Sequence, residues 1–381
     1  MDSAEAPARR RSRRMAAAGA AIVVLVAAGV VGWRVTMAER EEPLRPVAAG
    51  VGEVFTDLPA HLPRPTQVTA LPTDRAAGPG ALIYHRKISN GRYDPGGRSF
   101  EQHDVYLVTR SGEQFRIGRT PADMGPLNLS LSPDGRWLAA KRDDRWRIRD
   151  LSGTTEYEVE VGYELWLWST DARSVLLAEP SATGRTFASM ALPGGGVRLL
   201  GLPLSALGGE VAFIAGREVA VYDANPLDSV SATRDLTLSL RDVLTGSSRQ
   251  LTVIRAGQLG PGEAVGPMVG LWRAGGDPPT IWMEVGRPDL VPADLPEAPL
   301  VAPSVALLGV DVASGAPTTR IELPSTDGRQ VCLGVVADGV ALLRSTAGGT
   351  ELVVVDPRRD NRRVVTTFPE AVSVLVPGAR A

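Results

Sequence analysis

Two kinds of short turn alternate along the chain between residues 79 and 361, and they restrict the possible folds more than any other feature. The best-preserved turn is Ser132-Pro133-Asp134-Gly135, and the apolar run Trp137-Leu138-Ala139-Ala140 follows it closely. Pro133 fixes the φ angle that the second position of a tight turn needs, and Gly135 tolerates a positive φ. An apolar run that leaves such a turn is typical of a β-strand. This stretch therefore predicts a reversal between two adjacent strands.

Both kinds of turn recur. The first kind returns, with degenerate turn residues, at Pro79-Gly80, Asp171-Ala172, Gly216-Arg217, Asp277-Pro278 and Asp338-Gly339. The second kind ends an alternating strand in small or polar residues, at Ser111-Gly112, Ser152-Gly153, Gly194-Gly195-Gly196, Thr245-Gly246, Ser314-Gly315 and the stretch 357–361. Each member of the second series lies downstream of one member of the first series and, until the last, upstream of the next.

This alternation predicts an all-β fold. With a mean spacing of about fifty residues, it indicates a six-bladed β-propeller of four-stranded antiparallel blades. The first series would join the inner two strands of each blade, and the second series the outer two. The long gaps around 250–305 leave room for a seventh blade. Segment 66–71 or segment 371–376 would pair across the closure and remove the open edge.

The stretch from Leu131 to Ala140 resembles the S-P-D-G repeat signature of TolB-like (WD40-like, PD40) β-propellers. The match covers ten residues and identifies a repeat type, not an activity. It implies a propeller, and TolB-like propellers are known as docking modules. Because a fold does not imply a function, the resemblance carries over only at the level of the fold.

The first 57 residues predict a membrane anchor and a tether. Residues 1–14 form a basic tail with five arginines, and the segment from Met15 to Trp33 is uncharged. A transmembrane helix over 15–34 would be about 30 Å long, which matches a bilayer core. The arginines place the N-terminus in the cytoplasm. Residues 35–57 would be a linker and 58–381 an extracytoplasmic propeller. The alternative is a signal peptide cleaved at the weak site Thr36-Met37-Ala38.

Composition narrows the classes of partner. The formal net charge is −2, which argues against nucleic acid as a bulk electrostatic partner. Cys332 is the only cysteine, so an intrachain disulfide and a thiolate metal cluster are both excluded. Only Lys87 and Lys141 among the 41 basic residues are lysines, a bias typical of a high-GC bacterial genome.

Two groups of residues are candidates for a binding surface. Arg145, Arg147 and Arg149 alternate with apolar residues, so they share one strand face. That face is either a solvated outer strand or a patch for an acidic polymer or lipid headgroup. Glu101, His103 and Asp104 end a long polar insertion that would be a hairpin loop, and they form either a solvated loop or a site for a hard or borderline metal. In a separate stretch, Trp166 and Trp168 predict an inner strand, with a paired-Trp platform as the alternative.

No catalytic motif accompanies these candidates. The sequence has no G-x-S-x-G elbow, no P-loop, no dinucleotide fingerprint and no zinc motif. We therefore expect no cofactor and a monomeric, non-catalytic module of the bacterial cell envelope that binds a protein or envelope ligand. The alternative is a propeller hydrolase or lyase that acts on envelope polysaccharide.

Overall fold

The computed structural model divides into two compact units, Met1–Pro46 and Val47–Ala381. The structure describes residues 58–89, 102–121, 129–142, 144–169, 171–181, 184–205, 211–214, 218–221, 230–231, 233–242, 245, 247–265, 272–275, 280–287, 304–323, 330–336, 339–356 and 361–378. The predicted tail, transmembrane helix and linker lie outside these ranges and remain predictions. The described residues include no helix that could span a bilayer.

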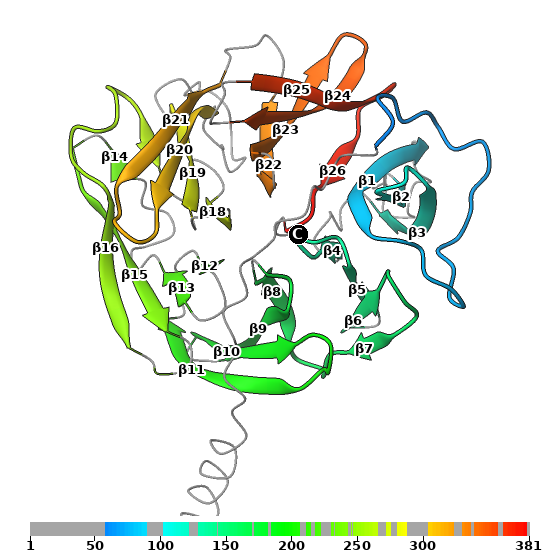
Figure 1. Ribbon diagram of the computed structural model, residues 1–381, viewed down its shortest axis with the longest axis horizontal. Coiled ribbons are helices and arrows are strands. Elements are labelled where there is room, and N and C mark those ends of the chain that lie inside the picture. Colours follow the sequence, from blue (N-terminus) through cyan, green and yellow to red (C-terminus); the bar gives the residue numbers. More distant parts are fainter. Residues whose placement is uncertain are drawn as a thin grey trace, which may run out of the picture. The chain divides into compact units, whose positions relative to one another are not determined.

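Every regular element in the described ranges is a β-strand, and the strands pair into six antiparallel sheets (Figure 1). Five sheets have four strands. Sheet 1 contains β26 (Ser373–Leu375), β1 (Gly80–Ser89), β2 (Gln102–Thr109) and β3 (Gln114–Pro121). Sheet 2 contains β4 (Leu129–Leu131), β5 (Trp137–Arg142), β6 (Arg145–Asp150) and β7 (Glu156–Glu158), and sheet 3 contains β8 (Glu164–Trp168), β9 (Ser174–Ser181), β10 (Gly184–Ala191) and β11 (Val197–Ser205). Sheet 4 contains β12 (Val211–Ile214), β13 (Glu218–Val221), β15 (Leu236–Asp242) and β16 (Ser248–Ile254), and sheet 6 contains β22 (Gln330–Val336), β23 (Gly339–Thr346), β24 (Gly349–Asp356) and β25 (Asn361–Phe368).

Sheet 5 departs from the four-stranded pattern. It contains β14 (Val230–Ser231), β17 (Ala264–Val265), β18 (Trp272–Gly275), β19 (Thr280–Gly286), β20 (Ser304–Asp311) and β21 (Pro317–Glu322). Strand β18 pairs with β19 from Thr280 to Met283, whereas β17 pairs with β19 at Gly286. Since β20 occupies the other edge of β19, β17 and β18 share one edge at different heights.

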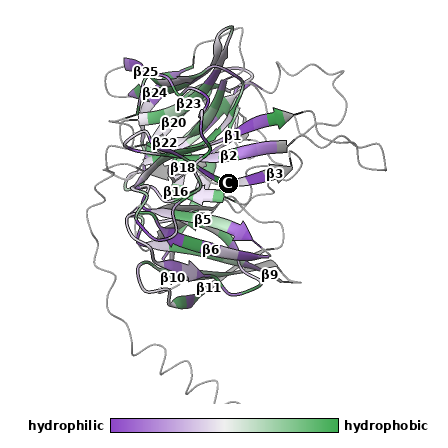
Figure 2. Cartoon of the chain, turned by 90° about the vertical axis from the view of Figure 1, so that its right-hand side faces the viewer, coloured by the Kyte–Doolittle hydropathy of each residue, from purple (hydrophilic) through white to green (hydrophobic). Residues whose placement is uncertain are grey.

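Five apolar clusters join neighbouring sheets and establish the order of a β-propeller. They connect sheet 1 to sheet 2, sheet 2 to sheet 3, sheet 4 to sheet 5, sheet 5 to sheet 6, and sheet 6 back to sheet 1. Apolar and polar residues alternate along many strands, so the sheets show mixed colours from the side (Figure 2). This period of two places one row of side chains against a neighbouring sheet. The predicted all-β propeller is confirmed, with five four-stranded blades and one sheet that differs.

Apart from Pro79-Gly80, the described turns lie where the sequence predicted them. Pro79-Gly80 precedes β1 and does not join two inner strands, because the inner neighbour of β1 is the C-terminal strand β26. Ser132–Gly135 joins the inner strands β4 and β5, and Asp171-Ala172 joins β8 and β9. Ser111-Gly112 and Ser152-Gly153 join the outer pairs of sheets 1 and 2. The turn residues Gly216-Arg217, Asp277-Pro278, Asp338, Gly246 and 357–360 fall outside the described residues, although the strands on either side of each are paired.

Both ends of the propeller region take part in closing the fold. The C-terminal strand β26 pairs with β1 and becomes the innermost strand of sheet 1, as predicted for segment 371–376. Residues 58–78, named the belt below, run along the outer strands. His61 forms a parallel bridge with Thr367 of β25, and Ala70 forms one with Arg116 of β3. The belt therefore connects the last sheet to the first by a second route, and Figure 1 shows it beside sheet 1.

Candidate functional site

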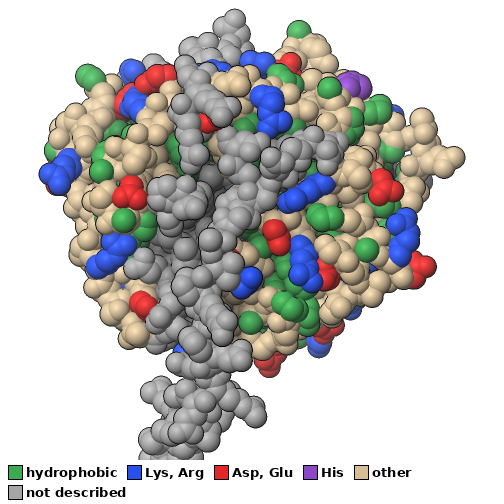
Figure 3. All heavy atoms as spheres, viewed as in Figure 1, with side chains coloured by type: hydrophobic (Ala, Val, Ile, Leu, Met, Phe, Trp, Pro, Cys, Tyr) green, Lys and Arg blue, Asp and Glu red, His purple; other side chains and the backbone are tan. Residues whose placement is uncertain are grey.

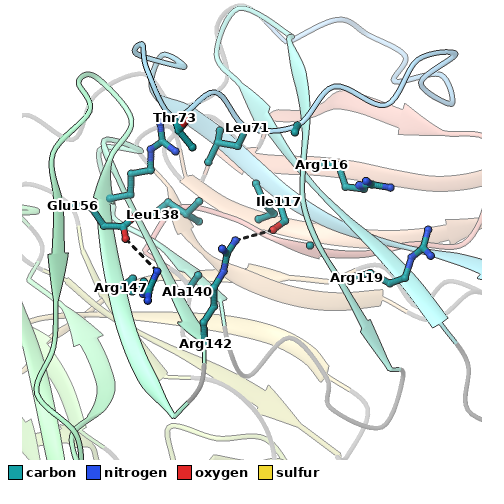
Figure 4. Close-up of a pocket in the computed structure, with 13 residues that line it drawn as sticks. Leu71, Thr73, Arg116, Ile117, Arg119, Leu138, Ala140, Arg142, Arg147 and Glu156 are labelled. Atoms are coloured by element: carbon teal, nitrogen blue, oxygen red, sulfur yellow. Dashed lines mark hydrogen bonds and ion pairs between the residues drawn. The ribbon is translucent and has the colours of Figure 1, made fainter.

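A cleft of about 700 Å³ lies between sheet 1 and sheet 2 (Figure 4). Strand β3 forms one wall, strands β5, β6 and β7 form the other, and the belt contributes residues 70, 71 and 73. The lining residues are Ala70, Leu71, Thr73, Arg116, Ile117, Gly118, Arg119, Leu138, Ala140, Arg142, Arg147, Arg149 and Glu156. Among the described residues, five arginines and one glutamate thus line a single cleft, in a chain whose formal net charge is −2.

The hairpin of β5 and β6 places its arginines on one face. Its register pairs Arg142 with Arg145, Ala140 with Arg147, and Leu138 with Arg149. Directly opposed residues of an antiparallel pair point to the same side of the sheet. The shared face predicted for Arg145, Arg147 and Arg149 is therefore present, and Arg142 joins it from β5. Sequence reasoning missed Arg142, although its place at the end of the partner strand was a usable signal.

Glutamates of β7 bind two of these arginines. Arg145 forms an ion pair with Glu158. Arg147 lies 3.8 Å from Glu156 (Figure 4). It also lies 3.8 Å from Glu158. The hydrogen bond from Arg145 and the positive charges of Arg145 and Arg147 hold the pKa of Glu158 below its usual range. Because these side chains are exposed or partly exposed, the pairs contribute little to stability and mainly neutralise each other.

Arg142 and Arg149 have only main-chain partners within the described residues. Arg142 donates a hydrogen bond of 3.4 Å to the carbonyl oxygen of Ile117 on β3 (Figure 4). Arg149 donates one to the carbonyl oxygen of Pro72 in the belt. Arg149 is only 9 % exposed, so this strand face is not simply solvated. Its burial depends on the belt, 77 residues earlier in the chain.

The two remaining arginines of the lining extend from β3. Arg119 forms an ion pair of 3.0 Å with Asp104 of β2. In Figure 4, the side chains of Arg116 and Arg119 point away from Arg142 and Arg147. The face drawn in Figure 3 instead carries basic and acidic side chains interspersed. The cleft therefore differs from that surface by its excess of positive charge.

Two of the three residues in the second predicted group lie in a strand and not in the predicted hairpin loop. Glu101 lies outside the described residues, whereas His103 and Asp104 belong to strand β2 and oppose Lys87 and Arg86. The correction follows from the continued pairing of β1 and β2, which reaches Ser89 and Gln102. The carboxylate of Asp104 is buried against Arg119. Among the described residues, no three His, Cys, Asp or Glu side chains come together as a metal site.

The predicted inner strand at Trp166 and Trp168 is β8. The indole nitrogen of Trp168 donates a hydrogen bond of 2.7 Å to the hydroxyl of Ser130 in sheet 2. Its ring is 5 % exposed and packs between sheets 2 and 3. Trp168 is therefore a packing residue of the interface between these sheets, and the side chain of Trp166 lies outside the described part.

The arginine cleft suits binding and not proton transfer. An arginine side chain stays protonated in proteins and presents five N–H donors in a planar fork. Such a fork binds carboxylates and phosphates through charge-assisted hydrogen bonds. Apart from the arginines and Glu156, the lining is aliphatic, small or a single hydroxyl.

Comparisons with known proteins give structural likeness only. No family model and no curated protein matches the chain. Similar solved structures include dipeptidyl peptidase 4 from Porphyromonas gingivalis, at 14% identity and a TM-score of 0.35, covering 75% of this chain and 50% of that one. An oligogalacturonate lyase in complex with manganese has 14% identity, a TM-score of 0.38 and coverage of 79% and 86%. TolB from Acinetobacter baumannii has 12% identity, a TM-score of 0.35 and coverage of 74% and 67%.

The chain thus spans half the length of the dipeptidyl peptidase. The similar proteins include enzymes as well as TolB, the propeller that the repeat signature resembles. At these identities and TM-scores, the likeness carries no argument about activity. The propeller itself rests on the sheets and on the clusters that join them.

Proposed function

We propose that this protein is a membrane-tethered, extracytoplasmic β-propeller that binds an anionic protein or envelope ligand without catalysing a reaction. The observation that carries the proposal is the cleft between sheets 1 and 2, with its five arginines and one glutamate. Strands of two sheets form the walls, and hydrogen bonds to the carbonyl oxygens of Ile117 and Pro72 orient Arg142 and Arg149 before a ligand arrives. Preorganisation of this kind lowers the entropic cost of binding.

A binding assay on the full chain in detergent tests the cleft. Polyglutamate, polygalacturonate and polyphosphate serve as probes because they share negative charge and differ in backbone. We expect at least one probe to bind, with affinity that falls as salt rises. Arg142→Gln and Arg147→Gln should weaken binding. Retention of full affinity in the double variant would exclude the cleft as the binding site.

The membrane tether is the second part of the proposal, and it is supported by the five arginines ahead of the uncharged segment from Met15 to Trp33. A reporter that is active only outside the cytoplasm, fused after Ala381, tests the orientation. We expect activity outside and membrane retention of the fusion. Activity of a cytoplasmic reporter at the same position would show that the propeller lies in the cytoplasm. Release of the protein from membranes would favour a cleaved signal peptide.

We also infer that sheet 5 is the sixth blade. Strands β18, β19, β20 and β21 give it the four-stranded order of the other blades. The two-residue strands β14 and β17 then extend its inner edge. An experimental map with six blades around one axis would support this count, and a seventh blade within 250–305 would contradict it.

A further inference from the structure

Three arginines of the cleft, Arg116, Arg142 and Arg149, have no carboxylate partner among the described residues. Arg116 points away from Arg142 (Figure 4), so Arg142 and Arg149 are the basis of this inference. Arg145 and Arg147 are neutralised by β7, and Arg119 by Asp104. Arg142 and Arg149 bind only the carbonyl oxygens of Ile117 and Pro72 within the part of the chain that the structure describes. A carbonyl oxygen carries no formal charge, so both guanidinium charges remain uncompensated.

Arg149 gives the stronger evidence that an external anion binds in the cleft. It is 9 % exposed, and its Nε atom is buried without a hydrogen-bond partner among the described residues. A buried charge without a counterion is strongly unfavourable, because desolvation is not offset by an ion pair. Since Arg149 lines an open cleft, an anion that enters the cleft would supply the missing negative charge beside its guanidinium group.

The strand register sets the spacing of the backbone positions that carry Arg142 and Arg149. Arg142 opposes Arg145, and Arg149 lies four residues further along β6. Four residues of a strand span about 13 Å. Ala140 lies midway between these positions, opposite Arg147, and Leu138 lies opposite Arg149. Ile117 adds apolar surface near Arg142. Glu156 lies beside Arg147 at the middle, where it would repel a third carboxylate.

We propose that the cleft binds an extended acidic peptide segment with two carboxylates four residues apart and an apolar residue midway. In an extended chain, residues i, i+2 and i+4 point to one side and span the same distance of about 13 Å. The first and last side chains would meet Arg142 and Arg149, and the middle one would pack on Leu138 and Ala140. The inference rests on the proposed function and names its ligand class.

The lining favours a peptide over a polysaccharide. Its apolar part is aliphatic, and none of the described residues that line it is aromatic. Flat aromatic rings provide the large rigid surface on which a sugar face could stack. Aliphatic side chains of irregular shape instead suit a leucine or valine of a partner chain.

A binding assay with designed peptides tests the proposal, using the full chain in detergent. The probe is a labelled nonapeptide of serine and glycine with two aspartates four residues apart and a leucine midway. One comparison peptide has the same composition with adjacent aspartates, and another has asparagines in place of the aspartates. We expect the first peptide to bind about tenfold more tightly than either comparison, the effect of one charge-assisted contact.

Variants on one strand face provide matched controls. Arg142→Gln, at an exposed position, should weaken the first peptide about tenfold and make the two aspartate spacings equivalent. Arg149→Met should weaken the first peptide to the same extent, and circular dichroism checks that this variant folds. Arg145→Gln removes an arginine from the same face outside the lining and should change affinity less than about twofold.

The outcomes separate the two proposals. Equal binding of both aspartate peptides, or unchanged binding by Arg142→Gln, overturns the spacing proposal. If polygalacturonate or polyphosphate binds through the cleft and no peptide does, the anion-binding function stands and the peptide class is wrong. If no anionic probe binds at low salt, both proposals are wrong.

Discussion

The hydroxyl of Ser132 donates a hydrogen bond of 2.6 Å to the carboxylate of Asp134 at the turn between β4 and β5. The same contact, with the same length, joins Ser169 to Asp171 at the turn between β8 and β9. Each aspartate also accepts from the main-chain N–H two residues later, at 3.0 and 3.1 Å. Each serine hydroxyl accepts from the N–H five residues later, at 2.8 and 2.9 Å. The repeat therefore preserves a hydrogen-bond unit, even where Pro and Gly are absent.

We predict that Asp134→Ala destabilises the protein without affecting the cleft. The substitution removes two hydrogen bonds that hold the turn, each worth about 1 kcal/mol. Urea denaturation should therefore give a free energy of unfolding about 2 kcal/mol lower than that of the native chain. Affinity for an anionic probe should be unchanged.

Asp171→Ala is the matched variant because it removes the equivalent pair of bonds. We expect a similar loss of stability. If Asp134→Ala abolished probe binding while leaving stability intact, Asp134 would be a site residue and its structural role would be refuted.

Gly135 and Ala172 occupy equivalent turn positions, and we predict that swapping alanine and glycine at the two positions changes the stability of the protein by different amounts. Gly135 has a φ of 69°, and a Cβ atom there would lie 2.0 Å from the carbonyl oxygen of Gly80. Gly135→Ala should therefore cost about 3 kcal/mol or more, because the backbone of β1 has to move. Ala172 already holds a φ of 57°. Ala172→Gly relieves strain of about 1 kcal/mol but loses a buried methyl of similar value, so its net effect should be small.

Calorimetric or chemical unfolding of the two variants measures this asymmetry. Equal effects of Gly135→Ala and Ala172→Gly would show that the contact with Gly80 does not hold in solution. The comparison is informative because both residues lie in turns with the same hydrogen bonds.

The buried His85 predicts a loss of stability in acid. Burial, and then the neighbouring His103, lower the pKa of His85 to about 4. The unfolded chain has an ordinary histidine pKa of about 6.5, so it binds more protons than the folded chain between these two values. The contribution of His85 to the free energy of unfolding is therefore fully present above about pH 6.5 and falls as the pH decreases toward 4. The loss from about pH 7.5 to about pH 5 should be about 2 kcal/mol.

His85→Asn should remove most of this dependence when the free energy of unfolding is measured across the same pH range. His61→Asn is the control, since His61 is exposed and bonds the hydroxyl of Thr367. A slope that persists in His85→Asn would assign the acid sensitivity to other groups.

Local rules predicted the propeller and one face of the cleft, but not the cleft itself. Turn chemistry placed the reversals at Asp134 and Asp171, and a period of two placed Arg145, Arg147 and Arg149 on one face. The burial of Arg149 depends on Pro72, a contact between distant segments that no local pattern encodes. His103 and Asp104 looked like loop residues because nothing in their sequence marks the continued pairing with β1. Sheet 5 differed because its inner edge is built from separate short strands.

The belt should contribute to stability as a part of the core. Leu62 is 2 % exposed and packs with Phe368 and other residues between sheets 6 and 1, and its N–H donates to the carbonyl of Thr367 at 2.9 Å. Leu62→Ala in the full chain should lower the free energy of unfolding by about 2–4 kcal/mol, the cost of a large-to-small change in a core. Val68→Ala, at a belt residue that is 49 % exposed, should change the free energy of unfolding by less than about 0.5 kcal/mol.

Hydrogen exchange gives a second readout, because the N–H of Thr367 donates to the carbonyl oxygen of Ala60 at 3.0 Å. Faster exchange of that N–H in Leu62→Ala is expected, and similar effects of both variants would show that the belt only rests on the surface.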